Sequence, residues 1–128
     1  MITADQLFLH ALGDYVIQSH WMATEKTRRW WPALVHAITY ALPFTLITTS
    51  PWALLVIAGT HALIDRYRLA RWVVWARNVL LRPPGQELDQ APGQAFPDDC
   101  PPYLGVWLVI IADNVLHVAI NAAALRWL

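Results

Sequence analysis

The chain has little charge, one cysteine and few glycines, and each shortage narrows the classes of protein to which it can belong. Only 14% of the 128 residues are charged and the formal net charge is zero, whereas nucleic-acid-binding domains are strongly basic. We therefore expect no nucleic-acid partner. The lone Cys100 excludes an internal disulfide and a zinc site made of several cysteines. No glycine-rich phosphate-binding loop occurs in the sequence.

Apolar residues, by contrast, make up 57% of the chain and gather in long runs. Residues 30–48, 51–64 and 103–125 are apolar almost throughout, and residues 4–23 form a more polar run with a helical pattern. A membrane-spanning helix needs about 20 such residues, and a soluble domain has about a quarter of its residues charged. The sequence predicts an all-α, integral-membrane four-helix bundle in one domain, residues 1–128. A soluble four-helix bundle is the alternative.

Capping residues and prolines set the expected helix limits. Thr3 is suited to cap the first helix and Pro43 should kink the second, while prolines crowd into the segment after Arg82. The expected spans are residues 4–25, 30–48, 52–68 with an amphipathic extension to residue 81, and 103–127. Residues 82–102 are expected to form the one long loop.

The basic residues give the expected topology. Lys26, Arg28 and Arg29 lie between the first two spans, and several arginines precede the long loop, whereas residues 48–52 carry no charge. By the positive-inside rule, the loop 82–102 faces the cytoplasm and both termini face outward. No basic residue precedes the first apolar stretch, so we expect no removable signal peptide. The sequence thus predicts a multi-pass protein of the cytoplasmic membrane.

One sequence pattern occurs twice. His10-Ala-Leu-Gly-Asp14 returns as His61-Ala-Leu-Ile-Asp65, and in each copy the next helix carries one histidine in an alanine-rich run, His36 and His117. The chain therefore resembles two helical hairpins in tandem, which would form a pseudo-repeat. A His and an Asp four residues apart lie on the same face of a helix, with side chains about 5–6 Å apart.

The acidic residues within these runs need partners. An ionised Asp at bilayer depth costs about 2.5–3.5 kcal/mol, so nearby histidines should neutralise it or share a divalent cation with it. Imidazole together with carboxylate suits Zn²⁺, Mn²⁺ or Fe²⁺. Since one tetrahedral zinc takes about four ligands, either two ions bind or some of the candidates orient the others. The candidate metal ligands are His10, Asp14, His36, His61, Asp65, Asp113 and His117.

Three further polar residues lie one turn from these candidates and could orient them: Gln18, Tyr40 and Asn121. A hydrogen bond between helices explains Gln18 equally well. For the whole set, the alternative is a metal-free polar network or a proton path. Haem ligation by paired histidines is a third hypothesis, which the neighbouring aspartates disfavour.

The spacing of these residues resembles that of a known family. The string His10-x-x-x-Asp14-Tyr15-x-x-Gln18-x-x-x-Met22-x-x-x-Lys26, followed by His36, His61-x-x-x-Asp65 and Asp113-x-x-x-His117, is similar to bacterial and phage membrane proteins grouped as domain-of-unknown-function family 3307. The resemblance spans nearly the whole chain outside the proline-rich loop, with Asn114 where that pattern usually has Gln. It implies a bacterial inner-membrane location and supports the chosen residues, and it implies no activity.

Two functions fit these residues, and the sequence leaves open whether the protein is an enzyme. A looser similarity to integral-membrane metal-dependent hydrolases implies a hydrolase of phosphate- or acyl-containing, lipid-like substrates, because a metal acidifies water and polarises such oxygens. The catalytic candidates are Asp14, Asp65 and Asp113, and the candidates for holding an anionic lipid are Arg66, Arg68 and Arg71. The alternative is a metal-ion or proton carrier in which the same residues form a path.

Overall fold

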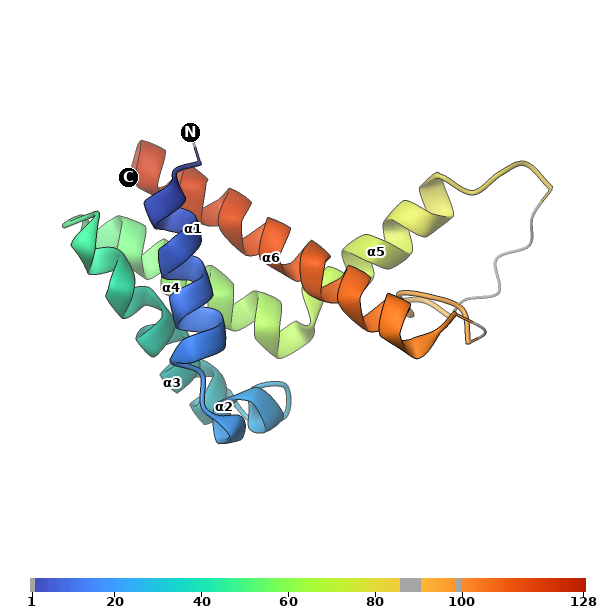
Figure 1. The fold of residues 1–128 in the computed structure, drawn as a ribbon, viewed down its shortest axis with the longest axis horizontal. Helices are drawn as coiled ribbons and strands as arrows, with labels where there is room; N and C mark the ends of the chain where they lie inside the picture. The colour runs from blue at the N-terminus through green and yellow to red at the C-terminus, as the bar shows by residue number, and fades with distance from the viewer. Residues whose placement is uncertain (1, 86–90, 99) are drawn as a thin grey trace.

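The computed structural model describes residues 2–85, 91–98 and 100–128, and folds them mainly into helices (Figure 1). The α-helices are α1 (Ala4–Ala11), α2 (His20–Glu25), α3 (Trp30–Ala41), α4 (Pro51–Tyr67), α5 (Leu69–Leu80) and α6 (Pro102–Trp127). A π-helix, η1 (Leu12–Val16), continues α1, and a 3-10 helix, η2 (Leu42–Leu46), continues α3. No strand occurs in these described ranges, so the predicted all-α class is confirmed.

The structure divides the first expected span, residues 4–25, into two helices. Thr3 caps α1 as expected, accepting a hydrogen bond from the Gln6 amide at 3.2 Å. The helix ends after η1, and Ser19 starts α2 by accepting from the Met22 amide at 3.3 Å. A serine hydroxyl that caps a new helix competes with continuation of the old one, which explains the break.

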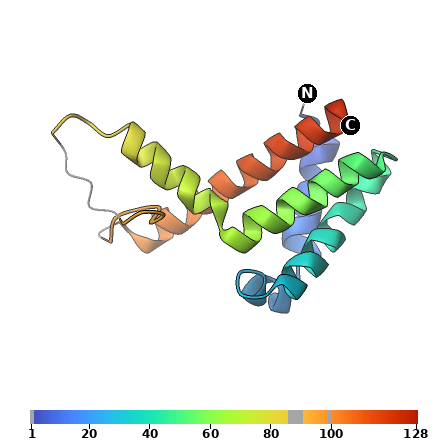
Figure 2. The ribbon, with the colours of Figure 1, turned by 180° about the vertical axis from the view of Figure 1, so that it is seen from behind.

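The next helices end where local chemistry requires it. α3 gives way to η2 at Pro43, as predicted, because proline supplies no amide to an α-helical ladder. Ser50 caps α4 by accepting from the Ala53 amide at 3.3 Å. The expected extension to residue 81 is a separate helix, α5, because Arg68 adopts a left-handed conformation with φ 53° and ψ 46°. From this residue α5 runs away from α1 and α3 and lies beside the N-terminal part of α6 (Figure 2).

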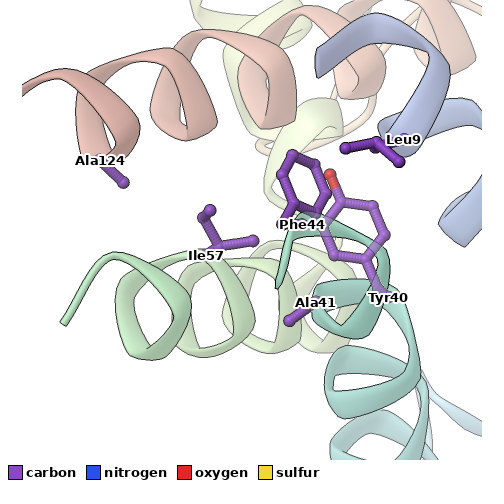
Figure 3. Close-up of a cluster of buried hydrophobic side chains, with 6 residues drawn as sticks. All are labelled: Leu9, Tyr40, Ala41, Phe44, Ile57 and Ala124. Atoms are coloured by element: carbon purple, nitrogen blue, oxygen red, sulfur yellow. The ribbon is translucent and has the colours of Figure 1, made fainter. Parts of the chain in front are cut away.

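The helices form a bundle with a protruding arm. α1, α3, α4 and the C-terminal part of α6 pack together, and the two chain ends lie near each other (Figure 1). α5 packs against α6 outside this bundle. Six buried side chains, Leu9, Tyr40, Ala41, Phe44, Ile57 and Ala124, form the apolar cluster where α1, α3, α4 and α6 meet (Figure 3).

One helix in the described part of the chain is long and apolar enough to cross a membrane. This helix is α6, with 26 residues and a mean hydropathy of 1.8. A membrane span usually needs about 17–25 residues, and α1, α3 and α5 are shorter than that. A single helix of this kind does not define a membrane protein, because core helices of soluble proteins reach the same length and hydropathy. Of the four expected spans, only the last, which corresponds to α6, meets this criterion of length and hydropathy in the described part of the chain.

Candidate metal centre

The helices bring six of the seven predicted ligands into two overlapping groups. The first group consists of Asp14 from η1, His36 from α3, and His61 and Asp65 from α4. The second consists of Asp14 again, with Asp113 and His117 from α6. Within each group, one ligand atom per residue lies within 4.8 Å of the others. These buried acidic and imidazole groups could hold a metal ion.

The first group has the dimensions of a tetrahedral site. Its two imidazole Nε2 atoms, from His36 and His61, are 3.0 Å apart. The Asp65 Oδ2 atom lies 3.3 Å from the first and 3.1 Å from the second, and Asp14 Oδ1 lies at 3.3 and 3.8 Å. Tetrahedral ligands with bonds of about 2.0–2.1 Å are separated by about 3.4 Å. Four side chains from three segments of the chain therefore converge at distances that would suit a tetrahedral metal ion.

The two histidine rings of this group point their Nε2 atoms toward the carboxylates. His36 and His61 are fully buried, and their Nε2 atoms face the carboxylates. Their Nδ1 atoms are buried without a hydrogen-bond partner among the residues that the structure describes. The polar contacts of both rings are thus concentrated at the Nε2 atoms, on the side where an ion would bind.

The second group shares Asp14 with the first. His117 is buried, and its Nδ1 lies 2.9 Å from the Asp113 carbonyl oxygen and 3.4 Å from the carboxylate Oδ2. If Nδ1 donates its proton to that carbonyl, Nε2 keeps a lone pair, and this atom has no partner among the described residues. A ring fixed through one nitrogen and free at the other is the usual arrangement of a metal-bound histidine. The shared Asp14 carboxylate could bridge two ions.

The π-helix places Asp14 in the cluster. A π-helix has more residues per turn than an α-helix, so residues four apart no longer stack on one face. Gly13 allows η1 to lie directly against α3, since a Cβ atom there would be 2.7 Å from Tyr40 Cδ2 and 3.1 Å from Tyr40 Cα. Asp14 turns toward His36 and away from His10, its predicted pair.

His10, the seventh predicted ligand, lies outside both groups. Its Nδ1 lies 2.7 Å from the Tyr40 hydroxyl, and its Nε2 lies 2.6 Å from Asn114 Oδ1. Asn121 donates to the same hydroxyl at 2.6 Å, and Asn114 donates to the Tyr15 hydroxyl at 2.5 Å. These bonds are all satisfied when Tyr40 donates to Nδ1 and the ring donates from Nε2. Both nitrogens of His10 are then occupied by hydrogen bonds, and its assignment as a metal ligand stays a prediction.

The residues predicted to orient the ligands lie next to the cluster. The Tyr40 ring stacks on His61, with ring centres 3.7 Å apart and planes inclined by 12°. Asn121 donates a hydrogen bond to the hydroxyl of this tyrosine at 2.6 Å. Gln18 lines the pocket beside the carboxylates, and its buried Oε1 has no partner among the described residues. Tyr40 and Asn121 thus support the rings, whereas Gln18 faces the open side.

Sequence reasoning did not place Lys26 at the site, although this residue belongs to the spaced motif. Its ammonium donates to Asp65 Oδ2 at 2.8 Å, and its side chain is 15% exposed. The loop after α2 is held by Arg66, whose guanidinium donates to the carbonyls of Thr27 and Arg28. The sequence does indicate that Lys26 could lie near the site, because it is the last of a series of residues spaced by four that begins at His10.

A pocket of about 360 Å³ opens beside the cluster. The three carboxylates Asp14, Asp65 and Asp113 line it, and so do three cations, Lys26, Arg68 and Arg71. Arg66 is not among the lining residues. It lies over the rings of Trp30 and Tyr67 at 5.7 and 5.8 Å, and binds the carbonyls described above. Of the three arginines predicted to hold an anionic lipid, Arg68 and Arg71 line this pocket, and their role in binding a lipid stays a prediction.

The molecule is an all-helical protein with a buried cluster of His and Asp side chains that could hold a metal ion. Residues 2–87 match the family described as Protein of unknown function (DUF3307), so the chain belongs to this family. This confirms the resemblance inferred from the spaced motif, over a shorter stretch that contains Asp14, His36, His61 and Asp65 but not Asp113 and His117. No curated protein and no solved structure matches the chain significantly.

Proposed function

We propose that the protein is a membrane-embedded, metal-dependent hydrolase that acts on a phosphate- or acyl-containing, lipid-like substrate. The observation that carries the proposal is the convergence of Asp14, His36, His61 and Asp65 at tetrahedral spacing beside a pocket lined by carboxylates and cations. A path for ions needs polar groups that reach both faces, whereas a catalytic site needs access from one side. The pocket supplies that access.

The two groups of ligands would have different roles. A site with four protein ligands is coordinatively closed, whereas three protein ligands leave a position for water or substrate. The group of four would bind an ion tightly, and the group formed by Asp14, Asp113 and His117 would hold the ion that faces substrate. Such a divalent ion supplies Lewis-acid chemistry, because it polarises a phosphoryl or acyl oxygen and acidifies water at the site.

The chain's own residues would provide the rest of the chemistry. Asp113 is the most accessible of the three carboxylates, with 26% of its side chain exposed; one of its oxygens would hold the ion, and we assign the other the role of general base. Asp14 and Asp65 are buried and hold their histidines in place. Lys26, Arg68 and Arg71 would bind the anionic part of the substrate from the pocket wall.

The membrane location is supported by an inverted distribution of side chains. Seven of the buried polar or charged residues are His, Asp and Asn side chains at or beside the cluster, while large apolar side chains such as Phe8, Trp31 and Trp52 are more than half exposed. Every α-helix carries at least one large, exposed apolar side chain. Apolar surface on this scale is unusual on a soluble monomer, and hydrocarbon would cover it. α4, with 17 residues, is just long enough to span with α6.

A topology experiment tests the membrane placement. Reporters that are active on one side of the membrane only would be fused within the 85–93 loop and at the C-terminus of the full chain. We expect the loop reporter to be cytoplasmic and the C-terminal reporter to be external. The opposite pattern would reverse the side from which substrate enters, and recovery of the protein in the soluble fraction would contradict the membrane placement.

Hydrolysis itself is tested with the full chain in mild detergent after zinc or manganese loading. Turnover of a phosphate monoester or an acyl ester of nitrophenol should require the metal and should fall by roughly 100-fold or more in Asp113→Asn. Asp98→Asn is the matched control, because this exposed carboxylate lies outside the cluster. Metal-loaded protein without turnover above that of Asp113→Asn would contradict the hydrolase.

One observation favours the second candidate, a metal-ion or proton carrier. Beside the cluster, where Tyr40 stacks on His61, hydrogen bonds join His10, Tyr40 and Asn121, and Gln6 is buried one turn before His10 on α1. Gln6 itself donates to the Val118 carbonyl at 2.8 Å. Flux of zinc or protons into vesicles reconstituted with the protein, lost in His10→Ala, would replace the hydrolase with the carrier. Flux equal to that of protein-free vesicles would exclude the carrier.

A further inference from the structure

A second pocket lies behind the one at the metal centre. It has a volume of about 600 Å³, within the roughly 300–1,000 Å³ typical of ligand sites. Arg68, Arg71, Val109 and Ile110 line both pockets, so the two pockets are adjacent and share this wall. Beyond it the lining is mainly apolar, with Phe96, Pro102 and Val106.

The shared wall carries two positive charges at a fixed position. Arg68 is the residue whose left-handed backbone joins α4 to α5, a conformation that costs about 1–2 kcal/mol for a residue other than glycine. Arg71 follows one turn later on α5. Within the described part of the chain, no hydrogen bond or ion pair is formed by either guanidinium. Strain at such a position is typical of functional sites, where the backbone is held to aim a side chain.

The net charge of the first pocket indicates which class of ligand it would accept. The first pocket has three carboxylates and three cationic side chains, so its net charge is zero when the histidines are neutral. The one or two divalent ions of the metal centre would raise that charge by two or four, so the pocket would favour an anionic ligand. A phosphate monoester carries about −1.5 to −2 at neutral pH and would offset this excess fully with one ion and in part with two. A neutral ester or a zwitterionic headgroup would not.

We propose that the second pocket binds the hydrocarbon chain of a single-chain phosphate monoester, whose phosphate lies between Arg68, Arg71 and the metal centre. The proposal rests on the proposed function and names its substrate class. The phosphate would sit in the first pocket and the chain would pass the shared wall to lie along Phe96 and Val106. Neither part alone would use both pockets.

Binding to the zinc-loaded full chain in detergent tests this, with three probes. Palmitoyl lysophosphatidic acid has both parts, glycerol 3-phosphate lacks the chain, and monopalmitoylglycerol lacks the phosphate. We expect the first to bind at least tenfold more tightly than either of the others. Equal affinity for glycerol 3-phosphate would show that the second pocket holds no chain and would overturn the proposal.

Two pairs of variants separate the two parts of the site. Arg71→Ala should weaken both phosphate probes by roughly 10- to 100-fold, the usual loss of a charge-assisted contact, whereas Arg82→Ala should change neither. Val106→Trp should weaken only the lysophosphatidic acid, since it fills the second pocket. Val115→Trp is its control, on the same helix and similarly exposed but outside the pocket.

The outcomes distinguish this inference from the proposed function. If Val106→Trp and Val115→Trp change binding equally, the hydrocarbon pocket is contradicted, although the metal centre stands. Gly105→Leu provides a second way to fill the pocket if Val106→Trp does not fold, since a Cβ at this glycine meets only ordinary contacts at 3.6 Å or more. Zinc content is measured on the same samples, and wild-type protein without stoichiometric zinc contradicts the proposed function.

Discussion

The two copies of the His-Ala-Leu-x-Asp pattern place their side chains differently in the fold. In the second copy, His61 and Asp65 lie on one face of α4, with Nε2 and Oδ2 3.1 Å apart, and both belong to the same group of ligands. In the first copy, only Asp14 joins that group, while His10 binds Tyr40 and Asn114. The second copy thus supplies two residues to one group of ligands, whereas the first copy supplies only Asp14.

The difference follows from the one residue at which the copies disagree. The second copy has Ile64 and forms a regular α-helix, in which residues four apart stack. The first has Gly13, and its missing side chain lets η1 approach the backbone of Tyr40. The π-helix there rotates Asp14 relative to His10. A repeated motif therefore defines a repeated site only if the helix around it keeps the same geometry.

The largest expected effect is on metal content, which should separate the two histidines. His61→Ala and Asp65→Ala should each abolish most bound metal, because they remove one of four converging ligands. His10→Ala should leave the metal in place, since both of its nitrogens are used elsewhere. Elemental analysis of the purified variants measures this, with exposed His20→Ala as a control. Equal loss in His10→Ala and His61→Ala would show that the two copies act alike.

Gly13→Ala tests the cause of the difference. Its Cβ would meet the Tyr40 side chain at 2.7 Å and backbone atoms at 3.1 Å, so we expect a loss of about 1–3 kcal/mol in the free energy of unfolding. Gly59→Ala is the matched control in α4, where a Cβ meets nothing within 4 Å. That variant should gain about 0.5–1 kcal/mol, because glycine is unfavourable within a helix.

Chemical denaturation in detergent gives both values. If Gly13→Ala were as stable as Gly59→Ala, the contact between η1 and Tyr40 would not be what holds the π-helix, and the separation of His10 from Asp14 would need another origin.

A smaller effect is expected from the hydroxyl that binds His10. Tyr40→Phe keeps the ring stacked on His61 and leaves the buried nitrogens of His10 and Asn121 without their shared partner. We expect a loss of about 1–3 kcal/mol in stability, with metal retained. Tyr15→Phe removes a hydroxyl from a half-exposed ring and should cost less. Loss of metal from Tyr40→Phe in a folded protein would mean that His10 contributes to the metal site.

The smallest effect concerns Gln18, at the open side of the cluster. If it orients a ligand, Gln18→Ala should weaken metal affinity by roughly 10- to 100-fold without removing the metal. Titration with a competing chelator measures the change. Unchanged affinity would assign Gln18 to packing between helices.

The sequence predicts well what local chemistry determines. The all-α class, the cap at Thr3, the change of helix type at Pro43 and the limits of α6 all follow from neighbouring residues. The identity of most polar residues in the interior also follows, because Asp and His in apolar runs must find one another. Six of the seven predicted ligands lie in the two groups for this reason.

The remaining features depend on contacts between distant segments. η1 requires the approach of Gly13 to Tyr40, which no local pattern contains. The left-handed Arg68 has no sequence signal, because arginine is rarely found in that conformation. The local sequence predicts that Lys26 is a surface charge, whereas in the structure Lys26, at the end of α2, contacts Asp65 on α4.

The most direct test is elemental analysis of the wild-type protein, purified in mild detergent without chelator and again after incubation with zinc or manganese. One ligand atom from each of Asp14, His36, His61 and Asp65 lies within 4.8 Å of the others. We expect about one to two equivalents of a first-row divalent metal, according to whether the group with Asp113 and His117 is filled. Well-folded protein with no stoichiometric metal under either condition would contradict the metal centre and leave a hydrogen-bonded or proton-conducting network in its place.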